Sequence, residues 1–165
     1  IEIKTKKEDV DYRKLIAAGS CFAEGEEVID YGFVERWILG LEEKYGVEVM
    51  QVGYDRYNAI STVQKLEANS MECVEVKQHS SVLHPPTKLL REAILKKEFA
   101  YDENRLLEIN FQNARCTEDT NLNKYLNKKR SAGKVDMVVS TIIAVYLMQQ
   151  AMLDNSELDW GIQVI

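Results

Sequence analysis

Two aspartates, Asp55 and Asp136, have the residue type and the local setting that a metal-dependent reaction needs. Asp55 follows the apolar segment "VEVMQVGY", which is predicted to be a strand, and Asp136 opens the long apolar segment "DMVVSTIIAVYLMQQAML". Ligands of open α/β sheets bind outside the carboxyl ends of strands, and an aspartate at a helix start can point toward that same end. Two carboxylates brought together repel each other unless a cation lies between them, and Mg²⁺ or Mn²⁺ takes such oxygen ligands.

A structural role for each aspartate stays open at this point. An aspartate at a helix start commonly caps the helix by accepting hydrogen bonds from its first backbone N–H groups. The spacing of Asp55 and Asp136 in the sequence does not show whether the two residues meet in space. The residue types alone therefore leave two interpretations for each aspartate, a helix cap and a metal ligand.

A cluster of basic residues precedes Asp136. Its members are Lys124, Lys128, Lys129, Arg130 and Lys134. Basic side chains beside a cation site would suit a phosphodiester substrate, because they neutralise backbone phosphates. A solvated loop is the alternative interpretation of such a charge run. The sequence has no glycine-rich phosphate loop and no G-x-S-x-G motif, so we expect neither ATP binding within the segment nor a serine nucleophile of that kind.

The length of 165 residues fits one domain, which we assign to residues 1–165, with residues 1–12 as a linker-like start and residues 154–165 as a C-terminal tail. Hydrophobic residues make up 45% and charged residues 29%, which excludes a disordered chain. The net charge of -6 means that any nucleic-acid binding must rest on a local basic patch. The three cysteines form no C-x-x-C pair and indicate reduced thiols, and His79 and His84 are too few for a structural zinc site.

Hydrophobic periodicity predicts alternating helices and strands, as in an α/β fold with parallel neighbouring strands. Helices are expected at residues 11–18, 30–46, 58–69, from Pro85 onward, and 136–153, and strands at residues 47–54 and 73–78. Asp30 is expected to cap the second helix and Gly46 to end it. The inward residues expected of the helix that Pro85 and Pro86 open are Leu89, Leu90, Ile94 and Leu95.

The segment 136–153 is apolar on nearly all sides and is long enough to raise the possibility of a membrane span. It also contains four polar residues, Ser140, Thr141, Gln149 and Gln150. We therefore interpret it as a helix buried against a sheet, and we expect no membrane partner.

Four segments of the chain, in order, resemble the C-terminal nuclease domain of the large terminase subunit of tailed bacteriophages. They are "EGEEVIDYGFVERWILGLEEKYGVEVMQVGYDRYNA", "HSSVLHPPTKLLREAIL", "NFQNARC" and "NKKRSAGKVDMVVSTIIAVYLM", and the matches extend from about Asp11 to Leu153. The resemblance implies an RNase H-like fold, with a mixed sheet flanked by helices, that cuts concatemeric double-stranded DNA during genome packaging. It also implies a cluster of acidic residues that holds two divalent cations, Mg²⁺ or Mn²⁺.

The resemblance assigns roles to individual residues. Asp55 and Asp136 fall on the family's catalytic, metal-binding aspartates, and Asn113 falls on an asparagine that would position a carboxylate or a phosphate. The implied DNA-binding residues are Lys128, Lys129, Arg130 and Lys134. The implied partners are double-stranded DNA, the terminase ATPase domain, the small terminase subunit and the portal protein, and the implied location is the cytoplasm of the bacterial host.

One part of the family pattern has no counterpart in this chain. The family's first strand carries another catalytic aspartate, whereas "IEIKTKKEDVDY" looks like the linker that follows that strand. We therefore expect a fold that lacks its first strands, and a segment that alone cuts DNA poorly or not at all. Two other interpretations remain: a non-catalytic packaging-motor fragment that docks to the portal or other terminase parts, and an unrelated α/β enzyme in which Asp55 is a nucleophile or ligand.

Overall fold

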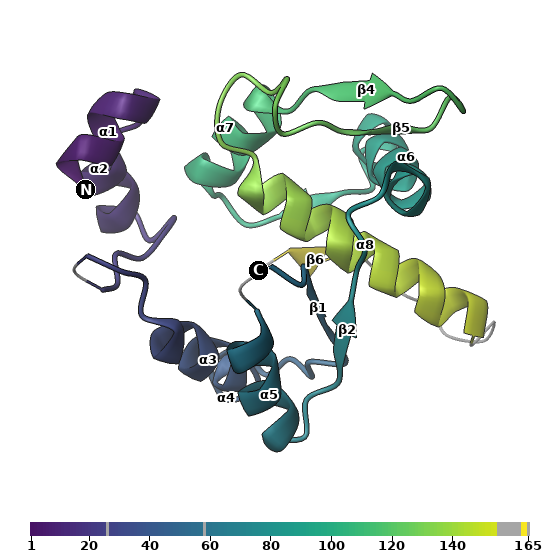
Figure 1. Ribbon diagram of the computed structural model, residues 1–165. Helices are drawn as coiled ribbons and strands as arrows, with labels where there is room; N and C mark the ends of the chain where they lie inside the picture. The colour runs from purple at the N-terminus through teal and green to yellow at the C-terminus, as the bar shows by residue number, and fades with distance from the viewer. Residues whose placement is uncertain (26, 58, 155–162, 165) are drawn as a thin grey trace. The chain divides into compact units, whose positions relative to one another are not determined.

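The computed structural model describes residues 1–25, 27–57, 59–154 and 163–164 (Figure 1). Its internal contacts divide the chain into two compact units. The first unit comprises Ile1–Ala23 and His79–Ile165, and the second comprises Glu24–Gln78. The assignment of residues 1–165 to a single domain stays a prediction.

The second unit contains three helices and two strands among its described residues. They are α3 (Tyr31–Leu39), α4 (Leu41–Tyr45), β1 (Val52–Tyr54), α5 (Ile60–Ala68) and β2 (Cys73–Glu75). The expected cap is confirmed, because the Asp30 side chain accepts the N–H of Gly32 at the start of α3. The single helix expected over residues 30–46 is interrupted at Gly40, and Gly46 ends α4 with a φ of 67° that favours glycine.

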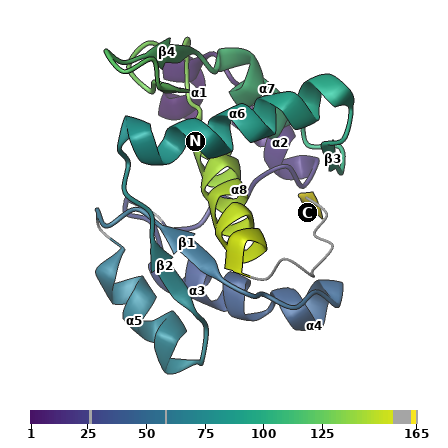
Figure 2. The same cartoon turned by 90° about the vertical axis from the view of Figure 1, so that its right-hand side faces the viewer.

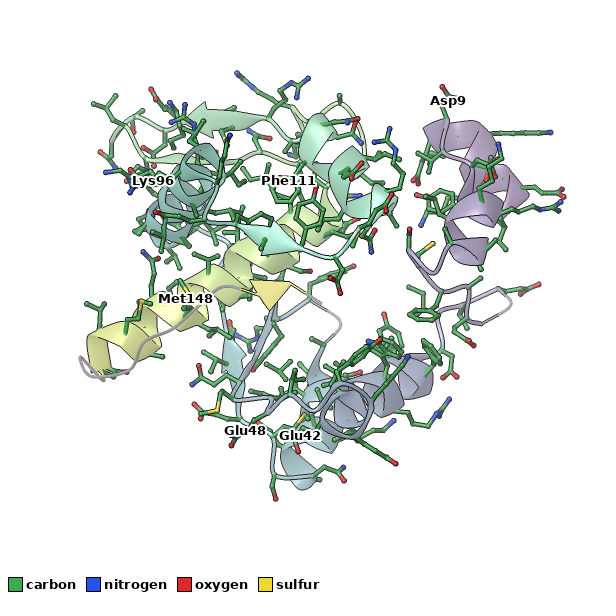
Figure 3. All side chains as sticks on the ribbon, turned by 180° about the vertical axis from the view of Figure 1, so that it is seen from behind. Asp9, Glu42, Glu48, Lys96, Phe111 and Met148 are labelled. Atoms are coloured by element: carbon green, nitrogen blue, oxygen red, sulfur yellow. The ribbon has the colours of Figure 1, made fainter. Side chains whose placement is uncertain are left out.

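Strands β1 and β2 are parallel and are joined through α5, as the sequence predicted. Val52 pairs with Cys73, Gly53 with Val74 and Tyr54 with Glu75. The strand expected over residues 47–54 is shorter, since its pairing begins at Val52. Before that point the N–H of Val49 bonds to the Glu42 side chain at 3.3 Å instead of to another strand (Glu42 is labelled in Figure 3).

Helix α5 packs against α3 through both apolar and charged contacts. Val63 and Leu66 of α5 are buried. On α3, Glu35 is only 7% exposed, yet both of its carboxylate oxygens are satisfied. Thr62 Oγ1 donates to one oxygen at 3.1 Å, and Lys65 Nζ lies 2.9 Å from the other. This pairing fixes α5, and with it the connection between the two parallel strands.

The first unit is mostly helical. Its described elements are α1 (Glu2–Glu8), α2 (Tyr12–Ala17), α6 (Ser80–Lys96), β3 (Ala100–Tyr101), α7 (Arg105–Asn113), β4 (Cys116–Glu118), β5 (Lys124–Leu126), α8 (Asp136–Asp154) and β6 (Gln163–Val164). Figure 2 shows α6 crossing α8, and α7 also packs against α8. The buried side chains of these three helices include Leu83, Leu90, Leu107, Val138, Ile142 and Val145. This apolar packing forms the core of the unit.

The strands confirm a mixed α/β composition but not one continuous sheet. The described strands form three separate pairs: β1 with β2, β3 with β6, and β4 with β5. The first two pairs are parallel, and β4–β5 is an antiparallel hairpin. Where a mixed sheet flanked by helices was predicted, the described residues form three two-stranded sheets among helices.

Helix α6 differs from its prediction in two respects. It begins at Ser80, not at Pro85, because the His79 side chain accepts the N–H of Ser81 and caps an earlier turn. Ile94 and Leu95 were expected to face inward and are instead 41% and 66% exposed. Leu95 lies off the buried stripe of this helix, and Ile94 belongs to its last turn.

Both chain ends contain a short structured segment, and the assignments of residues 1–12 as linker-like and of residues 154–165 as a tail stay predictions. Residues 2–8 of the linker-like start form α1. In the tail, Gln163–Val164 pairs with β3, and residues 155–162 and 165 lie outside the described residues.

The helix expected over residues 136–153 is confirmed as α8 (Asp136–Asp154). Within its own unit α8 packs against the helices α6 and α7, and its expected packing against a sheet stays a prediction. Among the described residues it is the one helix long and apolar enough to cross a membrane by length and composition. Six of its residues are buried in the protein, which agrees with the interpretation as a core helix.

We expect Lys65→Ala to lower the free energy of unfolding by about 1–2 kcal/mol, because it leaves the buried Glu35 carboxylate without its positive partner. The matched control is Lys88→Ala, which breaks an exposed pair with Glu92 at 3.9 Å and should cost about 0–0.5 kcal/mol. Urea unfolding of both variants measures the difference. Equal losses would show that burial of Glu35 does not strengthen its pairing.

Candidate functional site

Asp55 lies directly after β1, at the carboxyl end of a parallel strand, where the sequence predicted it. Its side chain is exposed, and Oδ1 accepts the N–H of Tyr57 at 3.3 Å. The next helix, α5, begins at Ile60, and its N-cap residue is Ala59, with no side-chain cap hydrogen bond. Asp55 therefore stabilises the turn after the strand and does not cap the helix.

Asp136 is the first residue of α8, and its side chain is 68% exposed. Lys128 Nζ lies 3.8 Å from Oδ1 of this carboxylate. The helix dipole favours a negative charge in the first turn, so Asp136 at this position does not destabilise α8. The exposed carboxylate has room to accept a ligand from solvent.

The cap of α8 comes from another helix. The carbonyl of Val135 accepts the N–H of Val139 at 3.0 Å, which makes Val135 the N-cap residue. Its apolar side chain cannot accept a hydrogen bond, but Asn110 of α7 does so in its place. Asn110 Oδ1 accepts the N–H of Met137 at 3.2 Å. The structural interpretation of Asp136 as the helix cap is therefore wrong for its side chain.

Asn113, at the end of α7, lies against the segment that leads into α8. Its Nδ2 donates to the carbonyl of Lys134 at 3.2 Å, and its own carbonyl accepts the N–H of Ala132 at 3.0 Å. A Cβ atom on Gly133 would come within 2.6 Å of Asn113 Nδ2, so only glycine leaves room for this side chain. In the structure Asn113 thus holds backbone near Asp136; a role toward a carboxylate or phosphate stays a prediction.

The basic loop, residues 127–134, has a defined internal structure. Asn127 organises it, because its Oδ1 accepts the N–H groups of Lys129 at 3.0 Å and Arg130 at 3.2 Å. Its Nδ2 donates to Thr117 Oγ1 of β4 at 3.2 Å. The predicted DNA-binding residues on the loop are Lys128, Lys129, Arg130 and Lys134, and all four are exposed. The loop backbone is therefore held by hydrogen bonds, and its four cationic side chains face solvent.

The hairpin that leads into the basic loop is fastened to α6. Asp119 accepts hydrogen bonds from Ser80 Oγ at 2.6 Å and from Asn123 Nδ2 at 2.9 Å. These side-chain bonds hold the pKa of Asp119 well below its ordinary value. His84 Nδ1 accepts the N–H of Lys124 at 2.7 Å, and His79 caps α6. Both histidines therefore have structural contacts, and neither suggests a zinc site.

The first unit thus brings together Asp136, Asn113 and the basic loop, whereas Asp55 belongs to the second unit. Exposed carboxylates suit a hard divalent cation in ligand type. Among the described residues, however, no group of three or more His, Cys, Asp or Glu side chains gathers as a metal centre would. The donors fit Mg²⁺ or Mn²⁺ in kind, and the described residues do not supply a complete set.

Sequence reasoning missed Asn110. Its signal in the sequence is weak: an asparagine three residues after the buried Leu107, on the inward stripe of a helix. A polar residue at a core position needs hydrogen-bond partners, and this requirement could have marked it.

Comparison with known proteins gives two matches. Residues 2–152 match the family model described as terminase large subunit, endonuclease domain. The crystal structure of the HK97 bacteriophage large terminase is similar in fold, with a TM-score of 0.79 and 20% sequence identity. That similarity covers 88% of this chain, and the chain spans 30% of the solved one. No curated protein matches the chain.

We expect Gly133→Ala to lower the free energy of unfolding by about 1–2 kcal/mol, because the added methyl group displaces the Asn113 side chain from Lys134. The double variant with Asn113→Ala should cost less than the sum of the two single changes, since the methyl group then has room. Thermal or urea unfolding of the three variants measures this coupling. Strict additivity would show that the two residues do not interfere.

Proposed function

Because the chain belongs to the family of terminase large subunit endonuclease domains, we propose that it cleaves double-stranded DNA with divalent cations bound by Asp55 and Asp136. The family match over residues 2–152, nearly the whole chain, carries this proposal. The surroundings of the two aspartates support it. Both side chains are exposed, and neither caps a helix.

Asp55 and Asp136 are the proposed ligands of Mg²⁺ or Mn²⁺ in a two-metal site. Such cations supply the positive charge that activates water and stabilises the leaving oxygen in phosphodiester hydrolysis. The chain's own contribution is to hold the two carboxylates. Asp55 is fixed by the turn that follows β1, and Asp136 by the first turn of α8.

The basic loop is the proposed DNA-binding element. Lys128, Lys129, Arg130 and Lys134 present charge to solvent from a backbone fixed by Asn127 and Asn113. Charged side chains on a fixed base neutralise DNA phosphates without reading the base sequence. Lys128 lies 3.8 Å from Asp136, so phosphate binding and carboxylate chemistry would occur side by side.

The rest of the proposal extends beyond this chain. We assign it an RNase H-like fold, supported by the similarity to the HK97 large terminase, of which the chain spans 30%. The proposed partners are double-stranded DNA, an ATPase domain, a small terminase subunit and a portal protein, in the bacterial cytoplasm.

Helix α8 contributes buried residues to its unit and is proposed not to enter a membrane.

Asp55→Asn and Asp136→Asn should each abolish DNA cleavage by the polypeptide that carries this domain, while the fold is kept. An amide retains the shape of the carboxylate but loses the charge that a divalent cation requires. Plasmid cleavage with Mg²⁺ or Mn²⁺ measures the loss, and circular dichroism checks the fold. The control is Asp154→Asn, the same change at the opposite end of α8, which should cut at the parental rate.

A parental cleavage rate for Asp55→Asn or Asp136→Asn would remove that residue from the metal site. A parental polypeptide that fails to cut DNA under every metal condition would favour the non-catalytic docking fragment instead.

Replacing Lys128, Lys129 and Arg130 together by alanine should weaken DNA binding without regard to sequence. The log–log salt dependence of the affinity should flatten by about 0.9 for each lost phosphate contact. A binding titration over a range of salt concentrations measures the slope. Three exposed lysines elsewhere, Lys6, Lys7 and Lys97, give a control triple variant with the same charge change. If both triple variants have the same slope as the parent, the basic loop is only solvated.

A further inference from the structure

The first turn of α8 depends on a hydrogen-bond acceptor that its own N-cap residue cannot supply. The first N–H groups of any helix need partners outside the helix, and a serine, threonine, aspartate or asparagine at the N-cap usually provides one. Val135 occupies the N-cap of α8, and its side chain is apolar and buried, with 2% exposed. An external acceptor is therefore required.

Asn110 is that acceptor, and its own position is fixed. The residue is 3% exposed, so water cannot readily replace its partners. Its Oδ1 accepts the N–H of Met137 at 3.2 Å, and its Nδ2 donates to the carbonyl of Leu106 at 2.9 Å. Both ends of the amide are thus bonded, which fixes the side chain in one orientation between α7 and α8.

This arrangement leaves the neighbouring aspartate available. Aspartate is itself a good cap, and a cap carboxylate is occupied by backbone N–H groups. Here Asn110 bonds the N–H of Met137, the residue next to Asp136. The Asp136 carboxylate remains 68% exposed, and Lys128 Nζ lies 3.8 Å from it.

We propose that Asn110 is a positioning residue for Asp136: by capping α8 from α7, it holds the Asp136 carboxylate where a divalent cation binds. The inference rests on the proposed function of Asp136 as a metal ligand. Hydrogen-bond partners behind a metal ligand commonly set its affinity for the metal. Asn110 does so through the backbone, because it bonds the peptide group that joins Asp136 to Met137.

Helix α7 thereby sets the distance between the carboxylate and the basic loop. Three residues after Asn110, Asn113 bonds the carbonyl of Lys134 at 3.2 Å. The two asparagines lie one turn apart on α7 and hold the segments on either side of Val135. A shift of the first turn of α8 relative to α7 would move Asp136 away from the loop that is proposed to bind the phosphate.

The principal test is Asn110→Ala in the polypeptide that carries this domain. Mn²⁺ binding is followed by the paramagnetic broadening of the Met137 and Val138 amide NMR signals, and plasmid cleavage is measured separately. We expect about a tenfold or greater loss of Mn²⁺ affinity and of cleavage rate. The matched control is Asn104→Ala. This change removes the N-cap side chain of α7, the helix that carries Asn110, and its hydrogen bonds to the N–H groups of Leu106 and Leu107. Asn104→Ala should lower the free energy of unfolding about as much as Asn110→Ala does, but it should keep the parental Mn²⁺ affinity.

A rescue variant separates positioning from general destabilisation. Val135→Thr has the shape of valine and places a hydroxyl at the N-cap, where it can accept a first-turn N–H. Added to Asn110→Ala, it should recover most of the lost Mn²⁺ affinity. If Asn110→Ala does not fold, Asn110→Leu replaces it, because leucine has a similar volume and lacks the acceptor for Met137. Its Mn²⁺ affinity should fall about tenfold, and the parental affinity would overturn the inference.

The outcomes distinguish this inference from the proposed function. A parent that binds Mn²⁺ and cuts DNA, together with an Asn110→Ala variant that matches Asn104→Ala in both, would overturn the role of Asn110 alone. A loss that Val135→Thr does not restore would also overturn it. A parent that neither binds Mn²⁺ beside Asp136 nor cuts DNA would overturn the proposed function and, with it, this inference.

Discussion

The packing of α8 against α6 and α7 is the constraint on which the candidate site of the first unit depends. Val138, Ile142 and Val145 of α8 are buried, and burial of apolar surface is the main source of stability for such helix packing. Val135, the N-cap residue of α8, is buried, and an unpaired buried N–H in the first turn would cost about 1–3 kcal/mol. The hydrogen bond from Met137 to Asn110 avoids this cost. The contact between α7 and α8 therefore contributes to the apolar core and also fixes the position of Asp136.

The second unit positions its aspartate in a different way. A parallel strand pair ends at Tyr54 and Glu75, and the chain turns immediately after Tyr54. Asp55 stabilises that turn through the N–H of Tyr57, so its place follows from local geometry and not from a buried polar contact. The α5 connection is anchored to α3 by the buried Glu35, which gives the strand pair a fixed support.

The features that the sequence predicted well are those encoded by neighbouring residues. The cap at Asp30, the end of α4 at Gly46 and the long helix from Asp136 all rest on local patterns. The parallel pairing of β1 and β2 followed from strand, helix, strand order. The extent of the strands could not be predicted, because pairing partners decide it, and β1 begins only at Val52.

The contacts around Asp136 could not be predicted from sequence patterns either, because they too depend on partners distant in the sequence. Asn110 and Met137 are 27 residues apart, and no local signature links an asparagine in one helix to the first turn of another. The basic residues before Asp136 were visible as a charge run, but their fixed backbone was not. That backbone depends on Asn127, which accepts the N–H of Lys129, and on Asn113, which donates to the carbonyl of Lys134; neither residue belongs to a distinctive sequence pattern.

The division of the chain has a consequence for the order in which its parts form. Glu24–Gln78 is one continuous stretch placed between the two segments of the first unit. The contacts that define the second unit are made within that stretch, so they do not require the chain beyond Gln78. The segment Ile1–Ala23 must instead wait for residues beyond His79, as the bond between Asn104 Nδ2 and the carbonyl of Ser20 illustrates. An inserted unit that is already compact brings those two distant segments closer than a flexible loop would, and so lowers the entropy cost of joining them.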